Sequence, residues 1–180
     1  QGAGTAKTAP ELSGSFNAGG ARRVSMNDLS DLVAADAIVP RLLATSRRQA
    51  LQLMAETLAK SAGIDARAAF DTVLIRERLN GTGLGEGVAT PHGPLAGLTR
   101  PIAAFARLDP PQDFEAMDNR PADLVFMLLS PPDKSADHLK ALARISRFLK
   151  HPDVRAALRA ARGADELYAL IAGAVHSDAA

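Results

Sequence analysis

The 180-residue chain contains no cysteine and no tryptophan. Without cysteine it can form neither a disulfide nor a thiolate nucleophile, and it can build no cysteine-ligated zinc site. No apolar run approaches the roughly 18 residues that a membrane-spanning helix needs, so we expect no membrane insertion. These absences predict a soluble protein, and they fit a cytoplasmic location.

An excess of charge of one sign is also lacking. The chain has 21 basic and 20 acidic residues, a net charge of +1, and no run of more than two Lys or Arg. We therefore expect no nucleic-acid partner, because such proteins carry a basic patch or stripe. The hydrophobic content of 47% is typical of one compact domain.

The first 25 residues differ from the rest, being dominated by Gly, Ala, Ser and Thr. We expect residues 1–25 to be a tail, most simply expression-vector residues placed before Met26, with a native extension as the alternative. A single domain is expected over residues 26–176, followed by a short C-terminal end at 177–180.

Helical and extended patterns alternate along this domain. Residues 27–33 offer a cap and a short helical turn, and Pro40 places the extended run at 37–43 on a sheet edge. We expect helices at 46–63, 65–81, 135–150, 152–163 and 164–175, and strands at 101–111 and 122–130. In the helix at 135–150, Leu139, Leu142 and Leu149 are expected on the buried stripe, with Ile145 or Ser146. Strands interleaved with helices predict an α/β sandwich.

Residues 81–95, GTGLGEGVATPHGPL, place four glycines at alternate positions before His92, which stands between Pro91 and Gly93. Bulky side chains cannot obstruct such a backbone. The segment does not match the dinucleotide or P-loop glycine patterns, and the chain contains neither G-x-S-x-G nor H-E-x-x-H. The common nucleotide-binding, serine-hydrolase and helical zinc sites are therefore not indicated.

The residues in and before the glycine segment are instead of the types that bind phosphate. Open backbone N–H groups and an arginine both bind phosphoryl oxygens, and Arg76 and Arg78 precede the glycines. A neutral imidazole is a competent nucleophile near pH 7, so His92 is a candidate phosphohistidine. The alternative is that Pro-His-Gly is only a turn with a surface histidine.

The stretch LIRERLNGTGLGEGVATPHGPL resembles the active-site signature of the IIA proteins and domains of the bacterial phosphotransferase system, in the mannitol/fructose and nitrogen-regulatory class. The resemblance extends over about 26–175, including DFEAMDNRPADLVFMLLSPP and DHLKALARISRFL, and it is greatest to the free-standing nitrogen-regulatory branch. It implies an α/β fold with a mixed central β-sheet flanked by helices on both faces.

The resemblance also implies roles for single residues. His92 would accept a phosphoryl group from a histidine-containing phosphocarrier protein, as a phosphotransferase does through a phosphohistidine. Arg76 would neutralise charge on the transferring group, and His138 would donate a hydrogen bond or orient the site. Alternatively, Arg76 is a solvated helix residue paired with Glu77 or Asp71, and His138 is a surface residue.

Further phosphate contacts are expected from the glycine segment and its flanks. The expected phosphate-binding residues are Thr82, Gly83, Gly85 and Gly93. The Thr82 hydroxyl can instead support the turn. We expect no cofactor and no metal, because phosphoryl transfer between histidines needs only positioning and positive charge.

Three functions stay open from the sequence. The phosphorylation state of His92 can control regulatory target proteins, which the resemblance favours. His92 can instead relay phosphate to a sugar permease, or the chain can be a binding module without phosphate. Many relatives carry a basic residue after Pro-His-Gly where this chain has Pro94, so we expect partner contacts there to differ.

Overall fold

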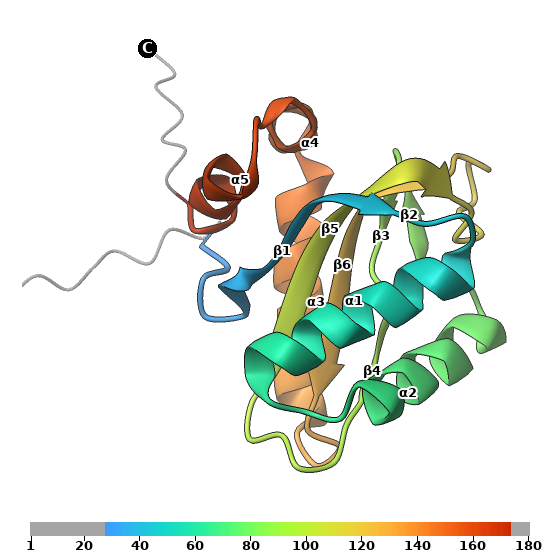
Figure 1. Cartoon of the computed structure of the whole chain (residues 1–180), viewed down its shortest axis with the longest axis vertical. Coiled ribbons are helices and arrows are strands. Elements are labelled where there is room, and N and C mark those ends of the chain that lie inside the picture. The colour runs from blue at the N-terminus through green and yellow to red at the C-terminus, as the bar shows by residue number, and fades with distance from the viewer. Residues whose placement is uncertain (1–27, 174–180) are drawn as a thin grey trace, which may run out of the picture.

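The computed structural model describes residues 28–173, so the expected tail at 1–25 and the expected end at 177–180 lie outside the described residues. Figure 1 shows helices on both faces of a central sheet. The strands are β1 (Val33–Leu43), β2 (Gly83–Gly85), β3 (Val88–Ala89), β4 (His92–Pro94), β5 (Ile102–Gln112) and β6 (Ala122–Ser130). The helices are α1 (Arg47–Ala62), α2 (Ala66–Leu79), α3 (Ser135–Lys150), α4 (Pro152–Ala160) and α5 (Ala164–Ile171).

The sheet is mixed. Its strand order is β1-β5-β6-β3-β2, and β4 also pairs with β6. Strand β1 runs parallel to β5, both β3 and β4 run parallel to β6, and the β5–β6 and β2–β3 pairs are antiparallel. The expected fold class is confirmed, and so is the edge position of the strand that contains Pro40.

Strand β6 lies between two apolar layers. Val125, Met127 and Leu129 pack with α1 and α2, whereas Leu124, Phe126 and Leu128 pack with α3, α4 and α5. This explains why residues 122–130 are continuously apolar, since successive side chains point to opposite faces and both faces are covered.

Local signals define the ends of the first two helices. The Ser46 hydroxyl accepts a hydrogen bond from the Gln49 amide at the start of α1, and Gly63 ends that helix in the left-handed conformation. The Asp65 carboxylate likewise accepts from the Ala68 amide at the start of α2. These expected caps are confirmed.

Two expectations differ from the structure. Leu139 is 65% exposed, because the face of α3 that packs on the sheet is formed by Ala141, Ile145, Phe148 and Leu149. The segment expected as an open glycine loop contains a β-hairpin, in which Glu86 and Gly87 both have positive φ. Two such residues at a hairpin tip match a type I′ turn, whose twist fits the flanking strands.

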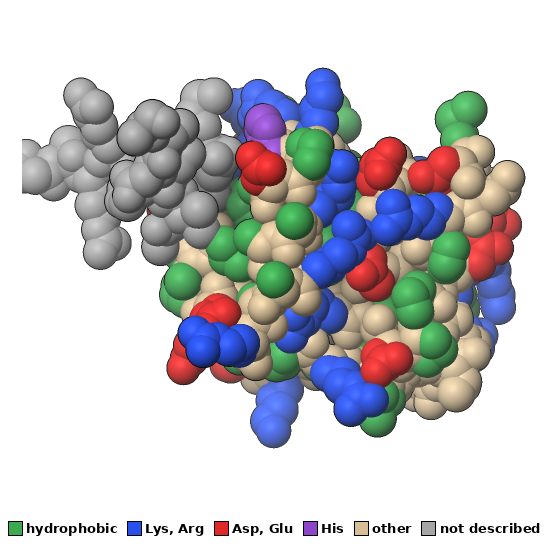
Figure 2. All heavy atoms as spheres, turned by 90° about the horizontal axis from the view of Figure 1, so that it is seen from above, with side chains coloured by type: hydrophobic (Ala, Val, Ile, Leu, Met, Phe, Trp, Pro, Cys, Tyr) green, Lys and Arg blue, Asp and Glu red, His purple; other side chains and the backbone are tan. Residues whose placement is uncertain are grey.

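Charged side chains fasten the hairpin to the C-terminal helices. Arg159 of α4 lies 2.9 Å from the Asp123 carboxylate and donates to the Glu86 carbonyl oxygen at 2.8 Å. Figure 2, which looks onto the end of the molecule that is uppermost in Figure 1, shows basic and acidic side chains interspersed on this face. The hairpin tip is thus held by α4 at the opposite end of β3 from β4.

Candidate active site

His92 is the first residue of β4 and is half-buried. It pairs with Leu128 of β6, whose side chain belongs to the layer of α3, so the imidazole also points toward α3. Its Nδ1 lies 2.8 Å from the carbonyl oxygen of Thr90. A carbonyl oxygen can only accept, so Nδ1 carries the proton and the lone pair of the neutral ring is on Nε2.

Burial is the largest influence on the charge of His92. Burial lowers the pKa of the imidazole, the hydrogen bond to Thr90 opposes this, and the charge of Arg76 lowers the pKa further. A lowered pKa keeps the ring neutral, and only the neutral ring has a free nitrogen lone pair. The site therefore holds His92 in its nucleophilic form.

His138 comes from the first turn of α3, and its ring centroid lies 5.2 Å from that of His92. The buried Ser130 hydroxyl at the end of β6 lies 2.6 Å from His138 Nδ1. Burial lowers the pKa of His138, and the neighbouring His92 lowers it further. The two expected histidines are thus brought together, and Ser130 is a site residue that sequence reasoning missed.

Arg76 reaches the site from the opposite layer. Helix α2 packs on β4 through Thr72, whose hydroxyl donates to the Pro94 carbonyl oxygen at 2.7 Å. Arg76 lies one helical turn beyond Thr72 on the same side of α2. Its Nη1 donates to the Asn80 carbonyl oxygen at 2.6 Å, and its charge lowers the pKa of His92. Arg76 thus extends from the helix that packs on β4, the strand that begins with His92.

Glu77, next to Arg76, is only 1% exposed. Thr82 donates to it twice, from the amide at 3.0 Å and from the hydroxyl at 2.6 Å. Burial raises the pKa of Glu77, while Thr82 and the charges of Arg47 and Arg76 act in the opposite direction. The Thr82 hydroxyl proton is thus committed to Glu77, and the structure favours its alternative role as turn support.

The glycines expected to bind phosphate are separated from one another. Gly83 pairs with Ala89, and its amide donates to the Phe114 carbonyl oxygen. Gly85 pairs with Val88, which is opposite Leu124, four residues along β6 from the partner of His92 and hence roughly 13 Å away. The structure does not bring Gly83 and Gly85 to His92. Gly93 alone of the glycines lies beside it, in close contact with Thr72.

Exposed apolar side chains accompany the two helical site residues. Ile75 and Leu79 of α2 are 64% and 78% exposed, and Leu139 of α3 follows His138. We name Ile75, Leu79 and Leu139 the apolar rim. A solvent-exposed large aliphatic side chain is ordinary by itself, but these three lie on the same helices as Arg76 and His138.

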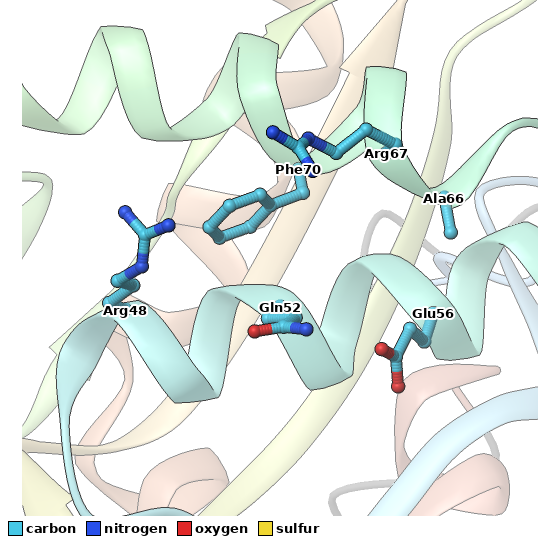
Figure 3. Close-up of a pocket in the computed structure, with 6 residues that line it drawn as sticks. All are labelled: Arg48, Gln52, Glu56, Ala66, Arg67 and Phe70. Atoms are coloured by element: carbon cyan, nitrogen blue, oxygen red, sulfur yellow. The ribbon is translucent and has the colours of Figure 1, made fainter.

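A hollow lies away from these residues, between the outer faces of α1 and α2 (Figure 3). It encloses about 260 Å³, and the Arg48 guanidinium lies over the Phe70 ring at one side of it, 5.2 Å from the ring centroid. Neither His92, Arg76 nor His138 lines it. His92 is half-buried and does not line this hollow.

Comparison with known proteins shows the family of the chain. Residues 31–174 match the family described as phosphoenolpyruvate-dependent sugar phosphotransferase system, EIIA 2. The chain belongs to this EIIA type-2 family. His92, Arg76 and His138 all lie within the matched residues. Among the described residues no group of three or more potential metal ligands is found, and no helix is long and apolar enough to cross a membrane.

Three proteins resemble the chain over most of its length. A nitrogen regulatory protein of Bradyrhizobium diazoefficiens is 50% identical over 144 residues, covering 80% of this chain and 94% of that protein. The crystal structure of the nitrogen regulatory protein IIA-Ntr from Neisseria meningitidis superposes with a TM-score of 0.74 at 29% identity, covering 79% of this chain and 97% of that one. The crystal structure of the mannitol IIA protein of Escherichia coli shares the fold, with a TM-score of 0.66 at 22% identity over 77% of this chain and 98% of that one.

Proposed function

We propose that this EIIA type-2 protein is a phosphoryl-accepting regulator of the nitrogen type, phosphorylated on His92 by a histidine-containing phosphocarrier protein. The observation that carries the proposal is the hydrogen bond from His92 Nδ1 to the Thr90 carbonyl oxygen, which leaves the Nε2 lone pair for attack. The family match and the similarity to nitrogen regulatory proteins support it.

In the proposed step, His92 Nε2 attacks the phosphorus of the carrier's phosphohistidine. A new N–P bond forms on His92 as the N–P bond of the carrier breaks, and that electron pair returns to the carrier's imidazole. Throughout the step, the proton stays on His92 Nδ1, which donates it in a hydrogen bond to the Thr90 carbonyl oxygen. Arg76 offers guanidinium N–H groups to the phosphoryl oxygens and His138 offers an imidazole donor, so charge is stabilised by fixed groups.

The apolar rim would receive the carrier. Donor and acceptor histidines must approach in line with water excluded, which requires a protein surface that packs around them. Ile75, Leu79 and Leu139 are exposed on α2 and α3, the helices that carry Arg76 and His138, and would supply such a surface. Pro94, next to Gly93, is exposed and carries no charge, so we expect partner contacts there to be uncharged.

Regulation would use the same surface. A phosphoryl group adds roughly two negative charges beside the apolar rim, which opposes desolvation there and repels acidic partners. A target bound by the unmodified form would then bind at least about tenfold more weakly after phosphorylation, a difference of about 1.4 kcal/mol. The alternative is relay to a sugar permease, which the family description favours.

Phosphorylation is tested by incubating the protein with phosphoenolpyruvate, the first enzyme of the system and the phosphocarrier, followed by intact-mass measurement. We expect a gain of one acid-labile phosphoryl group, none in His92→Ala, and an unchanged gain in His151→Ala, which removes an exposed histidine between α3 and α4. Label that persists in folded His92→Ala would contradict the assignment.

Regulation and relay are separated by a second measurement. The phosphorylated protein is mixed with sugar-permease IIB domains, and the unmodified and phosphorylated forms are compared for binding to purified candidate targets. Regulation predicts affinities that differ with the state of His92 and little transfer. Equal affinities together with rapid transfer to a IIB domain would favour the relay.

A further inference from the structure

The two facing histidines have chemically different partners at the same ring atom. His92 Nδ1 faces a carbonyl oxygen, whereas His138 Nδ1 faces the hydroxyl of Ser130 at 2.6 Å. A carbonyl oxygen only accepts, but a hydroxyl can also donate. The two imidazoles therefore need not carry their protons on the same nitrogen, and the surroundings of Ser130 determine which nitrogen of His138 is protonated.

Ser130 is 1% exposed, so water does not take its hydroxyl proton. Among residues 28–173, the one side-chain hydrogen bond that its Oγ makes is with His138 Nδ1. If Nδ1–H were the donor, the Ser130 proton would be buried without an acceptor, which is costly. The hydroxyl therefore donates to Nδ1, and the single proton of the neutral ring is on Nε2.

This assignment makes the two rings complementary. His92 has its proton on Nδ1 and a free lone pair on Nε2, whereas His138 has a proton on Nε2 and a lone pair on Nδ1 that Ser130 occupies. One ring can therefore attack phosphorus, and the other can only donate a hydrogen bond. The difference explains why two half-buried histidines at 5.2 Å need not compete for one phosphoryl group.

We propose that Ser130 is a positioning residue for phosphoryl transfer: its hydroxyl holds His138 as the Nε2–H tautomer, aimed as a donor at the group on His92 and unable to accept phosphoryl itself. The proposal rests on the proposed phosphorylation of His92.

The backbone keeps this arrangement in register. Ser130 is opposite Pro94 in the β4–β6 pair, and its carbonyl oxygen accepts from the Leu95 amide at 2.9 Å. His92 is opposite Leu128 in the same pair, so Ser130 and His92 belong to neighbouring, hydrogen-bonded strands. Both side chains point to the α3 face, since Leu128 and Ser130 are two residues apart. The hydroxyl that orients His138 is thus fixed relative to the ring that reacts.

The tautomer itself can be measured in the wild-type protein by nitrogen-15 NMR of the histidine side chains at pH 8. We expect His138 in the Nε2–H form and His92 in the Nδ1–H form. In Ser130→Ala we expect His138 to shift toward a mixture of the two forms, while Ser146→Ala, which removes another α3-side hydroxyl, leaves it unchanged. An Nδ1–H form of His138 in the wild type would overturn the proposal, whatever the phosphorylation assay shows.

A double-mutant cycle tests how Ser130 acts. Ser130→Ala should slow phosphoryl transfer to His92 roughly tenfold, the lower end of the cost of removing a group that orients a functional histidine. In a His138→Ala background, Ser130→Ala should have no further effect. An equal slowing in both backgrounds would overturn the proposal. A wild type that never accepts phosphoryl would refute the proposed function instead, and the NMR measurement distinguishes these failures.

Discussion

The Arg76 guanidinium takes part in two interactions, one with the backbone and one with His92. Nη1 donates to the Asn80 carbonyl oxygen at the end of α2, and the charge acts on His92. Arg76→Ala should therefore fold and yet accept phosphoryl at least tenfold more slowly, because losing one charge-stabilising donor costs about 2 to 4 kcal/mol in the transition state. Rapid-quench transfer kinetics measure this. Arg67→Ala, which removes an exposed arginine of the same helix, is the control, and equal rates for the two variants would show that Arg76 has no such role.

The lowered pKa values of His92 and His138 predict a pH dependence of stability. As pH falls below the usual histidine pKa of 6.5, the unfolded chain takes up protons before these half-buried rings do, so the free energy of unfolding decreases. The buried Glu77 carboxyl, with a raised pKa, contributes with the opposite sign at lower pH. The contribution of His92 to the change in unfolding free energy is therefore obtained by comparing the wild type with His92→Gln.

Urea unfolding of wild type and His92→Gln at pH 8 and pH 5.5 measures this dependence. We expect the wild type to lose more unfolding free energy on acidification than the variant does, and His151→Gln to behave like the wild type. A titration midpoint of His92 above 6.5 by NMR would contradict the sign of the prediction.

At the scale of elements, the contact of α2 with β4 sets the distance between Arg76 and His92. Gly93 lies at this contact, and a Cβ placed there would be 3.0 Å from Thr72 Oγ1 and 3.2 Å from the Thr72 carbonyl carbon. The second of these atoms is backbone, so α2 itself has to move. Gly93→Ala should displace Arg76 and slow phosphoryl transfer at least tenfold, since small displacements of positioned groups are costly.

Transfer kinetics and urea unfolding of Gly93→Ala are measured together with Gly163→Ala as the control. An added Cβ at Gly163 meets nothing within 4 Å, so that variant should keep its rate. Unchanged transfer by Gly93→Ala would show that the α2–β4 spacing does not govern the site.

At the scale of the whole molecule, the proposed docking surface for the phosphocarrier includes helices from opposite layers of the sheet. Leu79 belongs to the α2 layer and Leu139 to the α3 layer, and both are exposed. An aspartate at either position adds a charge that must be desolvated when the carrier packs there. Leu79→Asp and Leu139→Asp should therefore raise the KM for the phosphocarrier at least tenfold and leave kcat nearly unchanged.

Leu43→Asp provides the matched control for this docking surface. Leu43 is 62% exposed, but it ends the edge strand β1, on the opposite side of the sheet from β4. Its KM should match that of the wild type. If all three leucine variants had the same KM, the apolar rim would not be the docking surface.

Interactions between near neighbours in the chain were predictable from the sequence alone. The Ser46 and Asp65 caps and the end of α1 at Gly63 depend on residues a few positions apart. The prediction that His92 accepts phosphate followed from a short motif, and the resemblance extended that prediction to Arg76 and His138.

Tertiary structure alone decided which groups surround the reactive ring and in which protonation state they lie. The glycine segment turned out to pair as strands because Phe114, Asp118 and Arg159, distant in sequence, bind it there. Leu139 became exposed because α3 turns a different face to the sheet. The hydrogen bonds of Thr82 with Glu77 and of Ser130 with His138 form only once β6, α2 and α3 are packed. A hydrogen bond selects a tautomer through distance and burial, and neither quantity exists until the chain is folded.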